Sequence, residues 1–95
     1  IRRIHEELVT VRRDIHMHPE LAFQEARTAS LVAQKLVTLG IEVHRGLATT
    51  GVVGVIRGRT DTRGRAVGLR ADMDCLPMQE AGDKPHASKS SGRMH

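Results

Sequence analysis

Two aspartates lie two residues apart in the motif RADMD at residues 70–74, which directly follows an apolar run at residues 66–69. If that run is a strand that continues, its period of two directs the carboxylates of Asp72 and Asp74 to the same side. Proteins with α/β folds place their ligand crevices at the ends of sheet strands. Paired acids there suit metal binding, orientation of a metal-bound histidine or general acid–base work. A turn in which an aspartate caps the backbone is the structural alternative, and the residues alone favour neither.

Histidine and cysteine are the other candidates for chemistry. His16 and His18 lie on a predicted helix, where residues two apart point in different directions, whereas metal-binding helices use spacings such as i, i+4. We therefore interpret the pair as structural, since histidines are favourable near a helix C-terminus. Cys75 is interpreted as a small, partly buried thiol rather than a ligand for a soft metal. Three further histidines are isolated and predicted to be solvated: His5, His44 and His86.

Composition and length exclude several classes of protein. The 95 residues are 39% hydrophobic and 27% charged, which fits neither a disordered tail nor a membrane protein. No apolar run approaches the roughly 18 residues that span a bilayer, and the start lacks the apolar core of a signal peptide, so we expect a cytoplasmic protein. A single cysteine excludes an internal disulfide framework. One aromatic residue and no initial methionine suggest a fragment of a larger domain.

The net charge of +4 comes from residues 57–70, which hold five arginines and one acid. Binding of nucleic acid through such a stripe would need stacking aromatics or a groove-reading helix, and neither is present, so no nucleic-acid partner is expected. We interpret the segment as a solvated hairpin rimmed with arginine. Binding of an anionic partner or of a substrate carboxylate by one of these arginines stays an open alternative. The charged residues are Arg57, Arg59, Asp61, Arg63, Arg65 and Arg70.

Apolar periodicity predicts two helices. The first runs from residue 1 and ends before Pro19, and the second spans about residues 24–39, with Gly40 in the place of a left-handed cap. The start of the second helix has no Ser, Thr, Asp or Asn cap. The apolar stripes are Ile1, Ile4, Leu8, Val11 and Ile15 in the first helix, and Ala29, Val32, Leu36 and Leu39 in the second.

Three strands and a loop are predicted next. Residues 41–44 alternate as a half-buried strand does, and the β-branched run at residues 52–56 indicates a strand buried on both faces. A turn at residues 58–64 would then lead to a third strand at residues 66–71. Residues 72–95 have no periodicity and are predicted to be an open loop. The fold class is α/β and incomplete, because two helices cannot cover the sheet, and exposed apolar surface is expected.

The segment RDIHMHPELAFQE at residues 13–25 resembles the opening of the amidohydrolases of the M20 metallopeptidase family. RADMD with LP at residues 76–77 also matches, and this motif and HPEL together are far more specific than either alone. The resemblance spans nearly the whole chain. Other matching stretches follow in the same order: LGIEV at 39–43, TGVVG at 50–54, QE at 79–80, ASK at 87–89 and GRMH at 92–95. The resemblance implies that residues 1–95 are the N-terminal part of a zinc-exopeptidase-like catalytic domain. The rest of that domain and a lid or dimerisation domain would lie outside the chain.

The resemblance also implies where the metal ligands lie. In the family, Ala-Cys-Gly-His-Asp follows the Met-His pair, and its Cys and His, with later Glu and His residues, bind two divalent ions such as Zn, Mn, Co or Ni. The catalytic Glu lies later too. All the expected ligands therefore lie beyond His95. The 95-residue chain is expected to bind no metal tightly and to be inactive by itself.

Only a few site residues can be transferred from the family to this chain. Asp74 matches the acid that orients a metal-ligand histidine in the wider family, and is the candidate catalytic-site residue. Asp72 stands where related peptidases place a metal-binding histidine, and we treat it as lining the site. His95 is a candidate for the rim of the site and not for a ligand. Cys75 stands where the family usually has Ala.

The implied function is hydrolysis of N-acyl amino acids, such as hippurate-like amides, by a metal-activated water that a downstream Glu deprotonates. The implied substrate is a small molecule, no nucleic-acid or membrane partner is implied, and the full-length protein is expected to be a homo-oligomer. The alternative function is a small, non-catalytic, basic α/β module that binds an anionic partner through the hairpin at residues 57–70.

Overall fold

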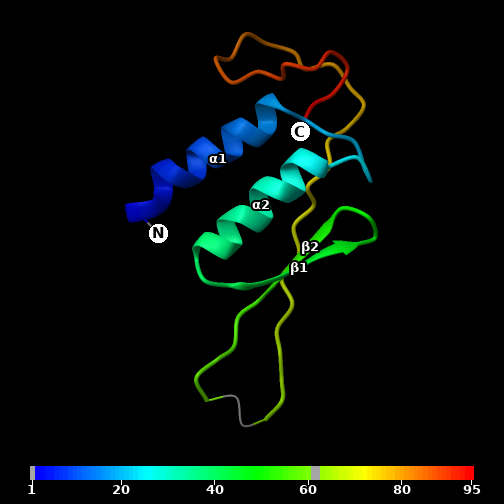
Figure 1. The fold of residues 1–95 in the computed structure, drawn as a ribbon. Coiled ribbons are helices and arrows are strands. Elements are labelled where there is room, and N and C mark those ends of the chain that lie inside the picture. The colour runs from blue at the N-terminus through cyan, green and yellow to red at the C-terminus, as the bar shows by residue number, and fades with distance from the viewer. Residues whose placement is uncertain (1, 61–62) are drawn as a thin grey trace.

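Two helices run side by side in opposite directions (Figure 1). The computed structural model describes residues 2–60 and 63–95. The 3-10 turn η1 (Arg2–Ile4) continues into α1 (His5–Met17), and α2 (Ala26–Thr38) follows a loop that contains the buried Pro19. Both predicted helices are therefore confirmed, although Ile1 lies outside the described residues. Between the helices lies an open groove of about 510 Å³, and the Lys35 ammonium reaches across to the Glu7 carboxylate at 2.7 Å.

The C-terminus of α2 is capped by Gly40, as the sequence predicts. Gly40 has a φ of +73°, its N–H donates to the Val37 carbonyl at 2.9 Å, and the Ile41 N–H donates to the Leu36 carbonyl at 3.1 Å. These two bonds form a Schellman motif, in which glycine adopts the left-handed conformation without a steric cost. The motif turns the chain from α2 directly into the first strand.

The sheet is a two-stranded antiparallel hairpin that packs against α2 (Figure 1). Strand β1 (Glu42–Leu47) pairs with β2 (Gly51–Val55), so that Val43 lies opposite Gly54, and a register irregularity falls near Leu47. A Cβ on Gly54 would lie 3.2 Å from a methyl group of Leu36 and 3.1 Å from one of Ile41. Glycine there lets the sheet approach the helix closely.

Three predictions about the strands are wrong for this chain. Residues 66–71 form no strand, because a strand requires a partner for its backbone groups and the described residues provide none. Strand β2 is not buried on both faces, since Val53 is 41% exposed. The turn predicted at residues 58–64 joins no two strands, because residues 66–71 form none, and its residues 61–62 lie outside the described residues. The turn of the observed hairpin lies at residues 48–50.

The buried core of the described residues is small. Its buried apolar side chains are Ala29, Ala33 and Cys75, and Thr28 is completely buried beside them. Leu39, predicted to lie on the buried face of α2, is 73% exposed. The expected exposed apolar surface is confirmed at Val67 and Leu69, which are 89% and 96% exposed. The radius of gyration is 15.6 Å, whereas a compact domain of this length has about 12 Å.

Residues 72–95 form a long loop without a helix or strand among them, as the lack of periodicity predicts. One isolated antiparallel bridge joins Leu76 to Met94, and the Lys89 N–H donates to the carbonyl of Met17 at the end of α1. The loop is thus attached to itself and to α1. No helix in the described part of the chain is long and apolar enough to cross a membrane.

Candidate functional site

The dipeptide Cys75-Leu76 is held from two sides. The Cys75 N–H donates to the backbone carbonyl of Glu20 at 2.8 Å. Leu76 and Met94 exchange two backbone hydrogen bonds, at 2.8 and 3.1 Å. These bonds join three stretches that are distant in the sequence: HPEL at residues 18–21, RADMD-x-LP at 70–77 and GRMH at 92–95. The two aspartates of the RADMD motif therefore directly precede a fixed point of the fold.

The side chain of Glu20 closes the N-terminus of α2. One carboxylate oxygen accepts the Arg27 N–H at 3.0 Å, and the other accepts both the N–H and the hydroxyl of Thr28 at 2.7 Å each. Burial raises the pKa of Glu20, but the hydrogen bonds from Thr28 and Arg27 outweigh it, so the pKa lies below its usual range. The residue that borders α2, Glu25, makes no side-chain cap. Glu20 thus provides the cap that the sequence analysis did not find.

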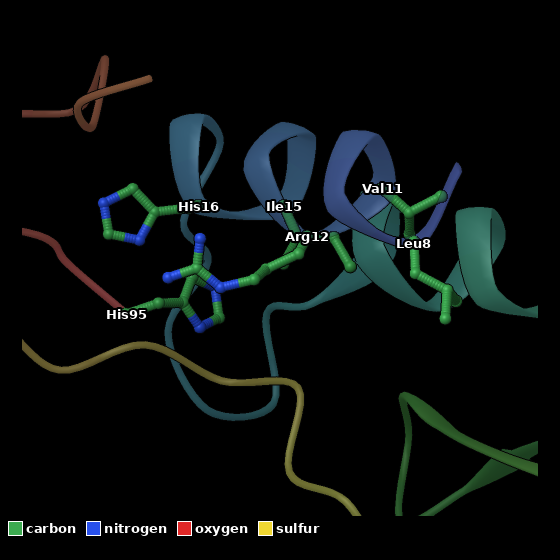
Figure 2. A pocket seen from close by; sticks show the side chains of 6 residues that line it. All are labelled: Leu8, Val11, Arg12, Ile15, His16 and His95. Carbon is green, nitrogen blue, oxygen red and sulfur yellow. The ribbon is translucent and has the colours of Figure 1, made fainter. Parts of the chain in front are cut away.

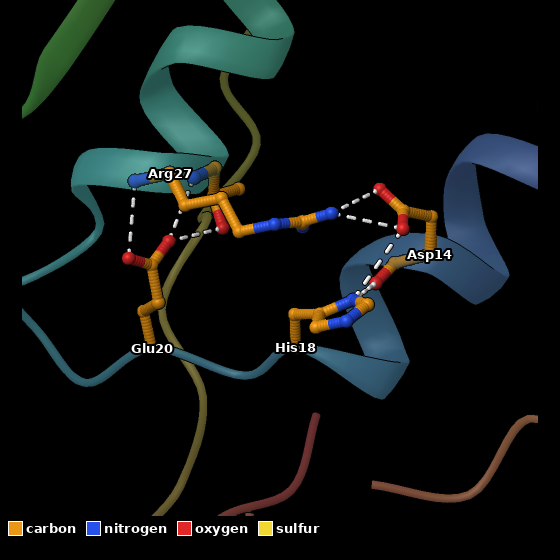
Figure 3. A network of polar contacts seen from close by, with 5 residues as sticks. Asp14, His18, Glu20 and Arg27 are labelled. Atoms are coloured by element: carbon orange, nitrogen blue, oxygen red, sulfur yellow. Dashed lines mark hydrogen bonds and ion pairs between the residues drawn. The ribbon is translucent and has the colours of Figure 1, made fainter. Parts of the chain in front are cut away.

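The polar contacts of Glu20 continue into a wider network (Figure 3). The guanidinium of Arg27 donates to both carboxylate oxygens of Asp14, at 2.9 and 2.8 Å. His18 Nδ1 lies 2.9 Å from the backbone carbonyl of the same Asp14. The network joins the last turn of α1 to the first turn of α2, and it fixes the loop between them.

Asp72 and Asp74 line one open cavity of about 270 Å³. Phe23 and Glu25 contribute to its wall from the loop before α2, and Thr50 contributes from the hairpin turn. Both aspartates are exposed, and the Arg70 guanidinium donates to Asp72 at 2.9 and 3.1 Å. The structure therefore brings together the RADMD, HPELAFQE and TTG stretches, although residues 66–71 form no strand.

Two loops that contribute to this cavity contain unusual backbone. Phe23, Ala48 and Thr49 have positive φ values of 62°, 46° and 78°, which are uncommon for residues other than glycine. Glu25 is only 7% exposed, and its carboxylate accepts the Thr50 hydroxyl, which lowers its pKa from the usual value. Such conformations cost about 1–3 kcal/mol each and cluster at functional sites. The bond between Glu25 and Thr50 holds the two strained loops together.

His95 lines a different cavity, of about 390 Å³, on the apolar face of α1 (Figure 2). Its Nε2 atom is buried and has no hydrogen-bond partner among the described residues. Burial lowers the pKa of His95, as does the nearby His16, whereas the charges of Asp74 and Glu20 act in the opposite direction. His95 does not line the cavity of the two aspartates. The lining residues are Leu8, Val11, Arg12, Ile15, His16 and His95.

The pair His16 and His18 is structural, as predicted. His16 Nε2 donates to the Glu80 carboxylate at 3.0 Å, whereas His18 binds Asp14. The prediction for His86 is wrong, because its half-buried ring packs edge-on against His16 with the ring centroids 5.8 Å apart. Loop residues near the end of the chain return to α1, and sequence spacing does not reveal that contact.

The predictions for Cys75, His5, His44 and the basic segment are confirmed. Cys75 is a free thiol and only 4% exposed. His5 and His44 are exposed, and His44 binds Glu42 on the surface of the hairpin. The basic segment is solvated: in its described part, residues 57–60 and 63–70 are exposed, with Arg57 paired to Glu42.

The residues of this chain do not form a metal site by themselves. Within residues 2–60 and 63–95, no three His, Cys, Asp or Glu side chains are grouped so that they could hold a metal ion. The buried, unpartnered nitrogen of His95 is one donor, whereas protein zinc sites use three or four ligands. The described residues therefore do not fit the two ions that the family resemblance implies.

Comparison with known proteins gives relatives over nearly the whole chain, although no family model matches it. A hippurate hydrolase from Campylobacter jejuni is 49% identical over 90 residues, which cover 94% of this chain and 23% of that protein. Thermostable carboxypeptidase 2 from Saccharolobus solfataricus is 46% identical over 96 residues, which cover 100% of this chain and 24% of that protein.

A solved structure shows the same fold. The YxeP protein of Bacillus subtilis, described as a dinuclear metal binding peptidase from the M20 family, matches with a TM-score of 0.90 and 42% identity, over 99% of this chain and 26% of that one. The two helices and the hairpin thus match the N-terminal part of an M20 peptidase domain. The chain belongs to the M20 family. It spans about a quarter of the length of the relatives it matches.

Proposed function

We propose that residues 1–95 are the N-terminal part of the catalytic domain of a metal-dependent amidohydrolase that cleaves N-acyl amino acids, such as hippurate-like amides. The observation that carries the proposal is the shared cavity of Asp72 and Asp74, into which three sequence motifs converge. A family hydrolase with the same fold over this part of its chain supports it. The remainder of the catalytic domain and a lid domain would complete the enzyme.

The two aspartates and His95 have separate roles in this proposal. Asp74 orients a metal-ligand histidine from another part of the enzyme, Asp72 lines the site, and His95 forms part of its rim. Two divalent ions, such as Zn, Mn, Co or Ni, would be bound by residues outside this chain, as the family resemblance implies. The metals would supply an activated water for attack on the amide carbonyl.

The proposed substrate class is supported by the names of the relatives. The relative from Campylobacter jejuni is a hippurate hydrolase, and the one from Saccharolobus solfataricus is a carboxypeptidase. Hippurate and the C-terminal end of a peptide share one chemical unit, an amide bond to an amino acid with a free carboxylate. We infer that the full-length protein recognises this unit, and that it is a cytoplasmic homo-oligomer.

Hydrolysis of hippurate and N-acetyl amino acids by the full-length protein, with Mn²⁺ or Zn²⁺ added, tests the function. We expect turnover by the wild type, a loss of about 10- to 100-fold in kcat/KM for Asp74→Asn, and no turnover by residues 1–95 alone. Glu6→Gln on the exposed face of α1 is the matched control and should leave activity unchanged. Turnover by the isolated 95 residues would contradict the claim that the ligands lie elsewhere.

A chimera provides an independent test. Residues 1–95 would replace the matching quarter of the Campylobacter jejuni hippurate hydrolase, to which they are 49% identical. If this chain is the same part of a hydrolase, the chimera should retain hippurate hydrolysis and should lose it on Asp74→Asn. A chimera that folds and binds metal but has no activity would overturn the proposal.

The alternative function, a basic module that binds an anionic partner through residues 57–70, is not favoured. The relatives that match nearly the whole chain are hydrolases and peptidases. Arg57 and Arg70 are each paired with an acid of this chain, Glu42 and Asp72.

A further inference from the structure

We propose that Glu20 is a positioning residue for Asp74. The Glu20 carboxylate is bound to the first turn of α2, and the Glu20 backbone carbonyl accepts the N–H of Cys75, the residue after Asp74. This inference rests on the proposed function, in which Asp74 acts at the hydrolytic site. Glu20 does not line the cavity of the two aspartates, so it acts through the backbone rather than on a substrate.

The first step of the argument is the attachment of Glu20 to α2. Three donors from two consecutive residues, Arg27 and Thr28, converge on its two carboxylate oxygens at 2.7–3.0 Å. Thr28 is completely buried, so the point of attachment lies in the core. A carboxylate is also favourable at a helix N-terminus, where the unpaired N–H groups carry partial positive charge.

The second step is the bond from Glu20 to the acidic segment. Its carbonyl accepts the Cys75 N–H at 2.8 Å, and the Cys75 side chain is 4% exposed. Asp74, in contrast, is exposed, and its side chain makes no hydrogen bond or ion pair with the described residues. The orientation of Asp74 therefore depends on the backbone of Cys75, whose N–H is bound by the Glu20 carbonyl.

The third step concerns the other backbone bonds of the acidic segment. Leu76 is bonded to Met94, but this bridge reaches α1 only indirectly, through the loop whose Lys89 N–H donates to the Met17 carbonyl. Residues 66–71, which precede the aspartates, have no strand partner among the described residues. The carbonyl of Glu20 is therefore the backbone bond that connects the acidic segment to the loop between α1 and α2.

Glu20→Gln in the full-length protein tests the proposal, with hippurate as the probe and Mn²⁺ added. A glutamine has one acceptor oxygen, so it cannot satisfy both Arg27 and Thr28. Because the effect is on geometry at the reacting centre, kcat should fall about tenfold or more while KM changes less than about twofold. Glu7→Gln, the same change at an exposed side chain of α1, should leave both constants unchanged.

A double-mutant cycle separates positioning from a general loss of structure. If Glu20 acts through Asp74, Glu20→Gln should lower kcat by less than about twofold in an Asp74→Asn background, since coupled effects are not additive. Equal losses in both backgrounds would mean that Glu20 only stabilises the fold, and would overturn the proposal. Circular dichroism at the assay temperature verifies that each variant is folded.

A second pair of variants decides the question if Glu20→Gln fails to fold. Thr28→Val removes the hydroxyl donor to Glu20, and Thr28→Ser keeps it. Thr28→Val should lower kcat about threefold or more at unchanged KM, and Thr28→Ser should restore it. Equal kcat values for these two variants would overturn the positioning role. If the wild type hydrolyses no N-acyl amino acid with any metal, the proposed function itself fails.

Discussion

The carbonyl oxygen of Leu47 lies only 2.5 Å from the position that a Cβ on Gly51 would occupy. The backbone therefore excludes every side chain at the first residue of β2. Gly51 also lines the cavity of the two aspartates, so the hairpin turn and the candidate site share this contact.

Gly51→Ala should therefore destabilise the protein by about 1–3 kcal/mol, the usual cost of forcing a methyl group into packed structure. Urea unfolding measures the loss. Gly58→Ala is the control, because no atom lies within 4 Å of its added Cβ. Equal unfolding midpoints for the two variants would show that the turn relaxes without cost.

The second prediction concerns the interaction of Glu80 with the loop and α1. Its carboxylate accepts the Ser88 N–H at 2.6 Å and contacts His16 Nε2 at 3.0 Å, and these bonds hold its pKa below the usual value. A lowered pKa contributes stability above the unfolded-state pKa of about 4.3, and this contribution is lost as pH falls through the folded-state pKa. The unfolding midpoint should therefore fall on acidification below about pH 5.

Glu80→Gln should weaken this acid dependence, because glutamine does not titrate. The urea unfolding midpoint of Glu80→Gln, measured at several pH values between neutral and acidic conditions, tests this prediction. The control is Glu6→Gln, which changes an exposed carboxylate of α1. A Glu80→Gln curve parallel to that of the wild type would show that the loop contact does not contribute to acid lability.

The third prediction concerns the end of α2. Gly40→Ala places a Cβ on a residue with a φ of +73°, and it should cost about 1 kcal/mol because the left-handed conformation disfavours a side chain. Gly68→Ala is the control, since it lacks a positive φ and has no neighbouring atom within 4 Å. Thermal unfolding should separate the two variants, and a stabilised Gly40→Ala would contradict the observed cap.

The fourth prediction concerns the thiol of Cys75. Because this side chain is 4% exposed, labelling of the native 95-residue chain by a thiol reagent should be at least about tenfold slower than in urea. An exposed thiol, introduced as Ser91→Cys in a Cys75→Ala background, provides the rate expected without protection. Equal rates for the two thiols in the native protein would show that the segment after Asp74 is not packed as described.

Local features of the sequence were sufficient to predict the helices and their ends. The apolar period of 3.6 and Gly40 placed the end of the second helix within one residue of Thr38. The start of that helix was uncertain, because its cap, Glu20, lies six residues before Ala26 and acts across a loop. No rule based on adjacent residues finds a cap at that distance.

Tertiary pairing limited the prediction of strands and of the site. Val67 and Leu69 have the residue types of a strand, yet pairing requires a neighbour that the described residues do not contain. The spacing of the RADMD motif indicated either a site or a turn, and the family resemblance favoured the site. The cavity that the motif shares with Phe23 and Glu25 is formed by loops about 50 residues apart in sequence, and the positive φ values of Phe23 and Ala48 leave no periodic signal.

The bridge between Leu76 and Met94 has a consequence for the order in which the chain assembles during synthesis. Both helices and the hairpin are built from contacts that are complete before residue 56, whereas the second attachment of Cys75-Leu76 requires a residue near position 95. During synthesis on a ribosome, Leu76 would emerge before Met94 and stay unpaired at first, while the helices and the hairpin are already formed. Hydrogen-exchange labelling of stalled nascent chains should therefore find the Leu76 amide protected only after Met94 has left the exit tunnel.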